Sequence, residues 1–385
     1  MKILFASDLG FRGVDERVSN EYVESALFDA KEAMKGADFR MLNLETLFNE
    51  SYPPIVKSGP NNRALPGYFH SLGYMNIDLV GLANNHTGDY GEECVYHNMK
   101  LLSENGFKYC GAGKNIDEAY KAEILEKEGE RVSVIAVCEN EFGTARVDFA
   151  GSAGFNLKRT YDAIRREKAK GNYAVVYFHG GNEGNPFPSP KKRDLYRLFI
   201  EFGADAVVGM HTHCPEGYEI YREKPIIYSM GNFFFTPNPK CPPTPDDAYF
   251  LGYMSELEFK GGNVSFRPIP YKYNVDRLTV LRGKQLETFE GYLKTISAPI
   301  KDEEELYRYF KGWCLIMGPI YAEHAKFSKE MIGNQEKCIH MKNAFCCEAH
   351  NELLCEYMQL CYDGITAENE EYKSKINALR RLSLD

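Results

Sequence analysis

The sequence predicts an α/β fold, on three observations. Short apolar, β-rich runs alternate with amphipathic segments from Met1 to about Tyr271, an order typical of sheets flanked by helices. Several of these runs are apolar nearly throughout, as strands buried on both faces are. Most of the runs also end in polar side chains, and in open α/β sheets the carboxyl ends of strands are where ligand-binding loops gather.

The expected strands are, in order, "KILFAS", "FRMLNLE", "IDLVGLANN", "RVSVIAVCE", "YAVVYFHGG", "ADAVVGMHTH" and "PIIYSMGNF". The expected helices between them include residues 19–34, 91–105 and 189–202. The last of these has Ser189 as a helix cap and Pro190 in the first turn. Two closing strands follow within "YFLGYMSELEFKGGNVSFRPIPY", around a Gly-Gly turn.

The composition changes after about Lys272, where β-type runs become few. Residues 285–296, 303–316, 326–331 and 343–360 are expected to be helical, and a boundary is placed near Asn274. Cys347 and His350 share a helical face at i and i+3, the best case for a zinc site in this segment. No Cys-x-x-Cys pair is present in the segment, so a packed helical bundle is the favoured interpretation.

Composition argues against several classes of protein. A net charge of -9 and a pI near 5.6 disfavour nucleic-acid binding, which usually needs a basic face. Eleven scattered cysteines indicate reduced thiols rather than a disulfide framework. The chain has no run long enough for a membrane span and no signal peptide, so a cytoplasmic location is expected. Association with a membrane through partners stays open.

Polar residues at the ends of the expected strands form the candidate site. They are Asp8, Asn43, Glu45, Asn84, Asn85, His86, His179, His211, His213 and Asn232. We expect them to converge in space although they lie far apart in sequence. The "HTH" spacing suits either a bend in the chain or a site that one histidine enters while the other supports a ligand, because alternate residues of an extended chain point to opposite sides. Such a mixed oxygen and nitrogen set suits Mn²⁺, Zn²⁺ or Fe²⁺.

The order of the motifs resembles that of the calcineurin-like metallophosphoesterases, and more closely that of their relatives in the CapA-type poly-γ-glutamate capsule-synthesis family. The motifs are "SDLG", "NLET", "LANNHTGDYG", "GAGKNIDEA", "FHGGNE", "VVGMHTHCPEGYE" and "PIIYSMGNFFF". The resemblance implies a four-layer αββα sandwich over residues 1–274. Residues 275–385 would then be a helical extension, to which the resemblance assigns no role.

The resemblance also implies roles for the site residues. Asp8 and His213 would bind one divalent metal, Asn85, His179 and His211 a second, and Glu45 would bridge the two. His86 would protonate a leaving oxygen or contact the phosphoryl group. Asn43, Asn84, Glu183 and Asn232 would contact substrate or support the ligands, and Asp89 would be a partner of a helix N-terminus. Gly10 replaces the histidine of the usual Asp-x-His, which leaves open whether one metal or two is bound.

The expected function is divalent-metal-dependent hydrolysis of a phosphoester or a related bond in capsule or poly-γ-glutamate biosynthesis. The expected partner is therefore an anionic polymer or its precursor. The alternative is a non-catalytic, metal-containing protein that binds a polyanion and assists polymer assembly or export. A third hypothesis is a phosphatase for a small nucleotide or sugar phosphate. The oligomeric state is left open.

Overall fold

Two mixed β-sheets form the centre of the computed structural model, which describes residues 1–237, 243–244, 246–364 and 367–384. The eight-stranded sheet runs in the order β16 (Leu278–Val280), β15 (Asn263–Tyr273), β14 (Leu251–Lys260), β1 (Lys2–Gly10), β2 (Phe39–Leu44), β3 (Leu79–Gly81), β4 (Lys108–Cys110), with β13 (Asn232–Phe235) also paired to β1. The six-stranded sheet runs in the order β11 (Tyr218–Tyr221), β12 (Lys224–Ile227), β10 (Ala206–Met210), β9 (Tyr173–His179), β7 (Glu130–Cys138), β6 (Glu123–Lys127). A small third sheet pairs β5 (Ala112–Gly113) with β8 (Gly151–Ser152).

The two large sheets pack face to face. Phe5 of β1 lies against Tyr177 of β9, with ring centroids 6.0 Å apart. The Tyr177 hydroxyl donates a hydrogen bond of 2.6 Å to the Ala6 carbonyl. Apolar residues of both inner faces belong to one buried cluster. This cluster fixes the distance between the sheets, and with it the distance between the residues that follow their strands.

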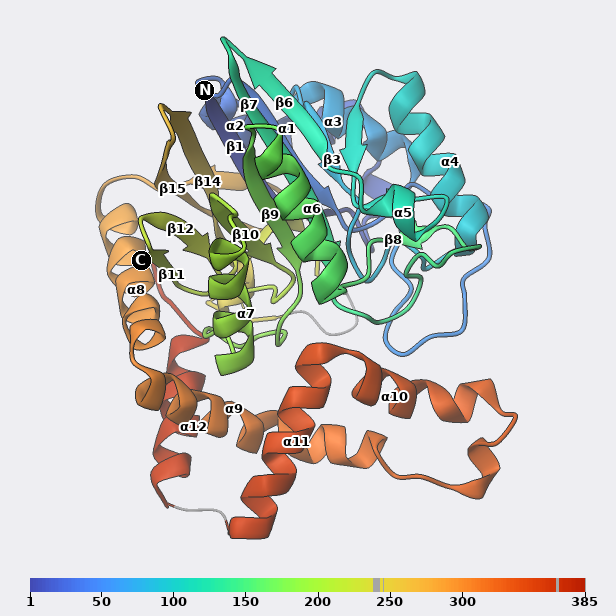
Figure 1. Ribbon diagram of the computed structural model, residues 1–385, viewed down its shortest axis with the longest axis vertical. Helices are drawn as coiled ribbons and strands as arrows, with labels where there is room; N and C mark the ends of the chain where they lie inside the picture. Colours follow the sequence, from blue (N-terminus) through green and yellow to red (C-terminus); the bar gives the residue numbers. More distant parts are fainter. Residues whose placement is uncertain (238–242, 245, 365–366, 385) are drawn as a thin grey trace.

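Helices cover the outer faces of both sheets (Figure 1). The eight-stranded sheet carries α1 (Asn20–Ala26), α2 (Phe28–Met34), α3 (His70–Tyr74) and α4 (Gly91–Glu104), and the six-stranded sheet carries α6 (Leu157–Ala169) and α7 (Pro190–Glu201). The short helix α5 (Ile116–Ala119) packs on β5. The predicted four-layer αββα sandwich is therefore confirmed.

Local sequence explains where these elements start and stop. The Ser189 hydroxyl accepts a hydrogen bond from the Lys192 amide and Pro190 opens α7, which confirms the predicted cap. The helix expected over 19–34 is interrupted at Leu27, where α1 ends and α2 begins. The eight-stranded sheet continues past Asn274 to Val280, because β16 pairs with β15.

A helical extension follows the sandwich. It contains α8 (Gly283–Ser297), α9 (Glu303–His324), α10 (Gln335–Cys346), α11 (Glu348–Asp363) and α12 (Ala367–Leu379). In Figure 1, α9 to α12 form a separate layer below the sandwich, and α9 packs against both α11 and α12. None of the helices within the described residues is long and apolar enough to cross a membrane.

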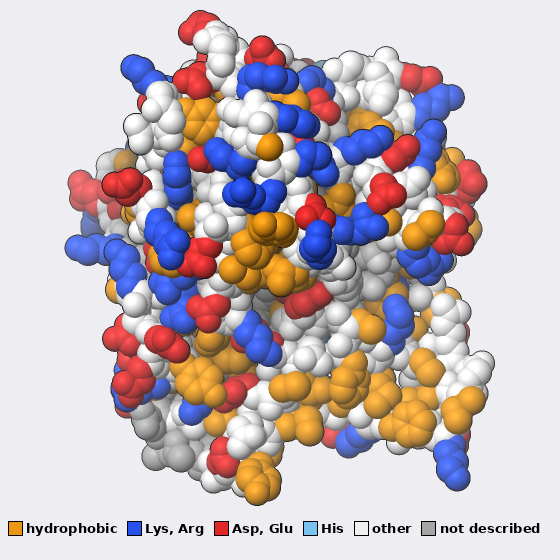
Figure 2. Space-filling view, viewed as in Figure 1, with side chains coloured by type: hydrophobic (Ala, Val, Ile, Leu, Met, Phe, Trp, Pro, Cys, Tyr) orange, Lys and Arg blue, Asp and Glu red, His pale blue; other side chains and the backbone are white. Residues whose placement is uncertain are grey.

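The surface of this layer differs from that of the sandwich. Large apolar side chains are exposed on it, at Phe327, Ile332, Phe345 and Met358. Figure 2 shows hydrophobic side chains gathered over this lower part of the molecule, whereas Lys and Arg are frequent over the sandwich above it. The helical layer therefore has a surface chemistry of its own.

Candidate metal centre

The polar residues predicted at the strand ends lie together at one edge of the sandwich. Asp8 lies near the end of β1, Asn43 lies in β2, and His179 is the last residue of β9. His211 and His213 follow β10. The parallel pairing of β1 with β2 and of β9 with β10 places these positions at the same edge.

Two groups of side chains at this edge could each hold a metal ion. Glu45, His179 and His211 form one group, and Asp8, Glu45 and His213 form the other. Within each group the candidate ligand atoms lie within 4.8 Å of one another. Glu45 belongs to both groups, as the sequence predicts for a bridging carboxylate.

Asn85 extends the first group. Its Oδ1 lies 3.0 Å from His179 Nε2, and His211 Nδ1 lies 3.0 Å from the same nitrogen. An amide oxygen and two imidazole nitrogens therefore converge on one point, which is a donor set that borderline divalent ions accept.

The backbone at "HTH" has a bend, one of the two arrangements that suit the spacing. His211 has a φ of 95° and His213 a φ of 55°, values that residues with a side chain rarely adopt. The chain turns at both positions, and the two imidazole centroids lie 6.0 Å apart. The His211 amide donates to Asp8 Oδ2 at 3.1 Å, which helps to hold this strained backbone.

Glu45 is the least satisfied polar side chain of the site. It is fully buried, and neither of its carboxylate oxygens has a hydrogen-bond partner among the described residues. Burial, and then the nearby Asp8 carboxylate, raise the pKa of Glu45 well above its usual range. A buried carboxylate without partners is costly, and a cation between the two groups would satisfy it. The residues present therefore fit a divalent metal.

The histidines of the site are suited to bind a cation as neutral ligands. Burial lowers the pKa of His213 to about 4, and burial together with the neighbouring His179 ring lowers the pKa of His211 well below its usual range. Neutral imidazoles keep a lone pair available at neutral pH, which metal ligation requires.

Three asparagines hold the candidate ligands in place. The Asn43 amide donates to Asp8 Oδ1 at 2.7 Å, and the Asn84 amide donates to Asn43 Oδ1 at 3.1 Å. Asn232 Oδ1 lies 2.8 Å from His213 Nδ1, which leaves Nε2 of that ring to face Glu45 Oε1 at 3.9 Å. Hydrogen bonds of this kind fix the orientation of metal ligands.

His86 lies beside this centre within a buried polar network. Its Nδ1 is 2.7 Å from Asp89 Oδ2, and its Nε2 is 3.0 Å from Asn62 Nδ2 and 3.8 Å from Glu45 Oε1. Lys57 forms an ion pair with Asp89 and lies 3.2 Å from His86 Nδ1. Burial, and then Lys57, lower the pKa of His86.

The prediction for Asp89 was wrong. Helix α4 begins at Gly91, after Tyr90 as its N-cap. The Asp89 carboxylate instead contacts His86 and Lys57 and accepts a hydrogen bond of 2.6 Å from the Asn62 backbone amide. In the tautomer in which His86 Nδ1 donates to Asp89 Oδ2, the ring's Nε2 accepts a hydrogen bond from the Asn62 side-chain amide.

The place of the missing histidine ligand is filled by an aromatic ring. A Cβ atom on Gly10 would lie 2.4 Å from two ring atoms of Phe235. The same ring stacks on His213, with centroids 4.9 Å apart and an interplanar angle of 23°. It also contacts the Arg12 guanidinium, whose carbon lies 4.5 Å from the ring centroid. The second group of ligands therefore has an aromatic wall where the resemblance would place a further imidazole.

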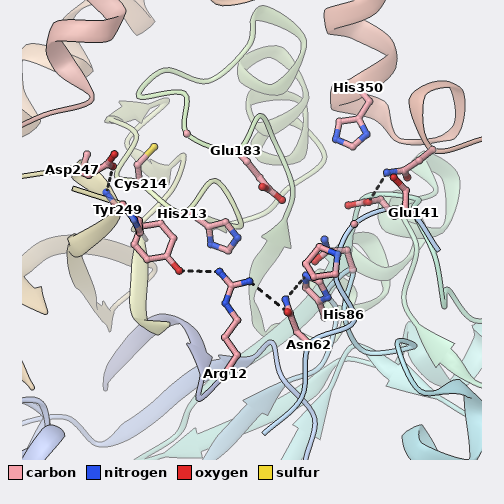
Figure 3. Close-up of a pocket in the computed structure, with 18 of the residues that line it drawn as sticks. Arg12, Asn62, His86, Glu141, Glu183, His213, Cys214, Asp247, Tyr249 and His350 are labelled. Atoms are coloured by element: carbon pink, nitrogen blue, oxygen red, sulfur yellow. Dashed lines mark hydrogen bonds between the residues drawn. The ribbon is translucent and has the colours of Figure 1, made fainter. Parts of the chain in front are cut away.

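A cavity of about 530 Å³ opens above the two groups. Figure 3 shows Arg12, His86, Glu183 and His213 around it. Glu183 exposes 56% of its side chain toward this space, and its Oε1 lies 3.9 Å from His211 Nε2. The predicted site residue Glu183 thus lies on the cavity side of the candidate ligands, where it can meet a bound molecule.

Sequence reasoning missed Arg12, Lys57 and Asn62. Arg12 could have been found, because it follows the first strand closely. Lys57 and Asn62 lie in an irregular segment between β2 and η2 (Pro66–Phe69), where neither spacing nor periodicity indicates a site.

The family model described as bacterial capsule synthesis protein PGA_cap matches residues 2–237 of the chain. The chain belongs to this family. The match includes every strand-end residue of the candidate centre and ends before the helical extension.

Curated relatives have names that also refer to the synthesis of a capsule, PGA or polyglutamine. The chain is 31% identical over 163 residues to the capsule biosynthesis protein CapA of Bacillus anthracis, a match that covers 41% of this chain and 40% of that protein. It is 28% identical over 164 residues to the PGA biosynthesis protein CapA of Bacillus subtilis (strain 168), which covers 42% and 43%. A probable polyglutamine synthesis accessory protein of Mycobacterium tuberculosis is 27% identical over 283 residues, which covers 65% and 70%. The chain spans less than half the length of the two CapA proteins.

Solved structures with a similar chain path include a novel phosphatase of Mycoplasma pneumoniae, at a TM-score of 0.43 and 10% identity over 70% of this chain and 92% of that one. A 5'-nucleotidase precursor of Thermus thermophilus has a TM-score of 0.41 and 14% identity, over 73% and 54%.

Proposed function

We propose that the protein is a divalent-metal-dependent hydrolase that acts on a phosphoester or a related bond in the synthesis of a capsule or poly-γ-glutamate polymer. The observation that carries the proposal is the position of Glu45, which belongs to both groups of candidate ligands. Its two buried carboxylate oxygens have no hydrogen-bond partner among the described residues. The biological setting comes from the family and from the names of the relatives.

Each residue has a separate task in this proposal. Asp8, Glu45 and His213 would hold one ion, and Glu45, Asn85, His179 and His211 a second. Mn²⁺, Zn²⁺ and Fe²⁺ all suit these donors. When bound, such ions supply Lewis acidity, which polarises a phosphoryl or carbonyl oxygen and lowers the pKa of water.

The chain's own groups would do the rest of the work. Arg12 is held toward the cavity by hydrogen bonds of 2.9 Å to the Thr236 carbonyl and 3.2 Å to the Tyr249 hydroxyl. A guanidinium so placed binds and orients a phosphate or carboxylate. His86 carries or accepts a proton at Nε2, and Asp89 fixes the ring through Nδ1. Because burial lowers the pKa of His86, the neutral ring would first take up a proton at Nε2 and then deliver it to a leaving oxygen.

The test is hydrolysis of bis(p-nitrophenyl) phosphate in the presence of Mn²⁺, Zn²⁺ or Fe²⁺. We expect turnover that His86→Ala lowers by about 10²- to 10⁴-fold, the usual contribution of an acid–base group. His97→Ala is the matched control, because His97 is exposed on α4, away from the site. Turnover that survives His86→Ala would refute the role of His86.

A second function is favoured by one observation, the ring of Phe235 beside Gly10. With this position closed to a histidine, the Asp8 group has fewer protein donors, and the site could serve to bind a polyanion through a metal during polymer assembly or export. Metal binding and polyanion binding without turnover for any of the three ions would favour this function over the hydrolase.

A further inference from the structure

The helical extension is fixed to the same loops that carry the candidate centre. We refer to helices α9 to α12 as the roof. Glu348, at the start of α11, accepts hydrogen bonds from the Asn140 amide at 2.9 Å and from its side chain at 2.6 Å. Asn140 lies just after β7, whose neighbour β9 ends at His179. The roof is therefore anchored next to a candidate metal ligand.

A second anchor holds the roof to α7. Glu352 accepts from the Ser189 hydroxyl at 2.6 Å and from the Lys191 amide at 3.2 Å. Phe187, in the loop before α7, stacks on Tyr309 of α9, with centroids 4.2 Å apart. Polar and aromatic contacts on two loops hold the roof in one position over the strand ends.

The roof supplies one side of the cavity. Tyr321 of α9, Asn343 of α10, His350 of α11 and Arg380, which follows α12, all line it. Figure 3 shows His350 on a roof helix, across the cavity from Glu183 and His213. The Nδ1 atom of His350 is buried and has no hydrogen-bond partner among the described residues. The His350 ring is thus the imidazole that the roof contributes to the cavity wall.

Two guanidinium groups lie at this cavity without an anionic partner in the described part of the chain. Neither Arg12 nor Arg380 forms an ion pair with a described residue, and both line the cavity. Arg380 packs over the Trp313 ring at 5.6 Å and lies against Gly184, where a Cβ would be 3.3 Å from its Nη2 atom. Unpaired guanidinium groups favour a ligand that carries phosphate or carboxylate.

We propose that the roof makes the site an end-on pocket for a single anionic group, so that it receives a small phosphate- or carboxylate-bearing molecule or the end of a chain, and not the interior of a long polymer. The inference rests on the proposed function for its setting. The cavity of about 530 Å³ lies within the volume range of small-molecule pockets. A site that reads the interior of a polymer would need an open groove, whereas roof residues line one side of this cavity.

Binding can be followed without turnover, because Trp313 is the only tryptophan of the chain and contacts Arg380. The probes are inorganic phosphate, a γ-glutamyl dipeptide and long poly-γ-glutamate, titrated into the metal-loaded full chain with Trp313 fluorescence and calorimetry as readouts. We expect phosphate and the dipeptide to bind, and the affinity per chain end to be the same for dipeptide and polymer.

Two roof variants test the named residues. Arg380→Ala and His350→Gln should each weaken dipeptide binding, Arg380→Ala by about tenfold or more, as expected for loss of a charged hydrogen bond. Arg381→Ala is the matched control, because Arg381 is exposed beside Arg380. Calorimetric unfolding of each variant shows whether it is folded, and His350→Gln keeps the test valid if Arg380→Ala does not fold.

The proposal is overturned if neither phosphate nor the dipeptide binds, or if the affinity per chain end rises with polymer length. It is also overturned if both roof variants bind the dipeptide as tightly as the wild type does. Its failure is distinct from that of the proposed function. Length-independent binding without hydrolysis would refute the hydrolase alone, whereas hydrolysis with affinity that rises with chain length would refute the end-on pocket alone.

Discussion

The ring of Phe235 fills the space that a side chain on Gly10 would need. A Cβ on Gly10 would lie 2.4 Å from two atoms of that ring and 3.0 Å from Thr46 Cγ2. The position at which the resemblance would place a metal-binding histidine is therefore closed by packing, and Phe235 in turn supports His213 by stacking.

Gly10→Ala tests this relationship directly. We expect it to lower the free energy of unfolding by about 1–3 kcal/mol, because the new methyl group overpacks the space beside Phe235. In the double variant with Phe235→Ala, the combined loss should be smaller than the sum of the two single losses, since the clash is gone. Urea unfolding gives the free energy of unfolding of the wild type, the two single variants and the double variant. Strictly additive losses would show that the two positions do not compete for space.

Glu45→Gln tests the bridging carboxylate. Mn²⁺ should raise the Tm of the wild type, because a ligand that binds only the folded state stabilises it, and this shift should vanish in the variant. Glu50→Gln is the control, since Glu50 is exposed and outside the site. Differential scanning calorimetry with and without Mn²⁺ gives the shift. An unchanged Mn²⁺ shift in Glu45→Gln would contradict the assignment.

Asp89→Asn tests the orientation of His86. The change keeps the shape of the side chain but removes the charge that holds a proton on His86 Nδ1 and pairs with Lys57. We expect kcat for the phosphodiester to fall by about 10- to 100-fold, the usual effect of a residue that orients a functional group, with bound metal unchanged. Asp148→Asn, at an exposed position, should match the wild type, and a similar loss there would point to a general effect.

Glu352 gives the roof anchor a pH dependence. Burial raises the pKa of its carboxyl, so the folded state favours the protonated form. The stability that this group contributes is full below its unfolded pKa and is lost as pH rises through the higher folded pKa. The Tm of the wild type minus that of Glu352→Gln should therefore decrease as pH rises from about 4 upward. A difference that increases with pH would mean that the charged form is favoured in the fold.

Much of the sandwich follows from local sequence. The apolar runs that end in Asp8, His179 and "HTH" indicated strands and a common edge, because strand burial and parallel pairing both depend on patterns that a single sequence contains. The bend at His211 and His213 was one of the two arrangements that the spacing allowed, and the positive φ angles of both residues show that the chain has it.

The roof could not be predicted in the same way. Among the side chains of helix α12 that the structure describes, the buried apolar ones are Tyr372 and Ile376, too weak a pattern to stand out. The helix expected over 343–360 is divided at Cys347, whose ψ of 130° separates α10 from α11, and residues 326–331 contain only the short η5 (Lys329–Met331). Contacts such as Asn140 with Glu348 join residues distant in sequence and depend on tertiary packing.

The zinc pair considered for the extension is not formed. The Cys347 thiol lies 3.5 Å from Glu139 Oε2, whereas His350 lines the cavity. The i, i+3 spacing assumed one continuous helix, and Cys347 instead has an extended backbone as the N-cap of α11.

Metal content is the first measurement to make on this protein. Protein purified without chelator or affinity metal would be measured by elemental mass spectrometry beside Glu45→Gln. We predict about one to two equivalents of Mn, Zn or Fe in the wild type, because two ligand groups share Glu45, and a clear loss in the variant. Wild-type protein that stays free of metal after incubation with each of these ions would contradict the assignment of a metal centre.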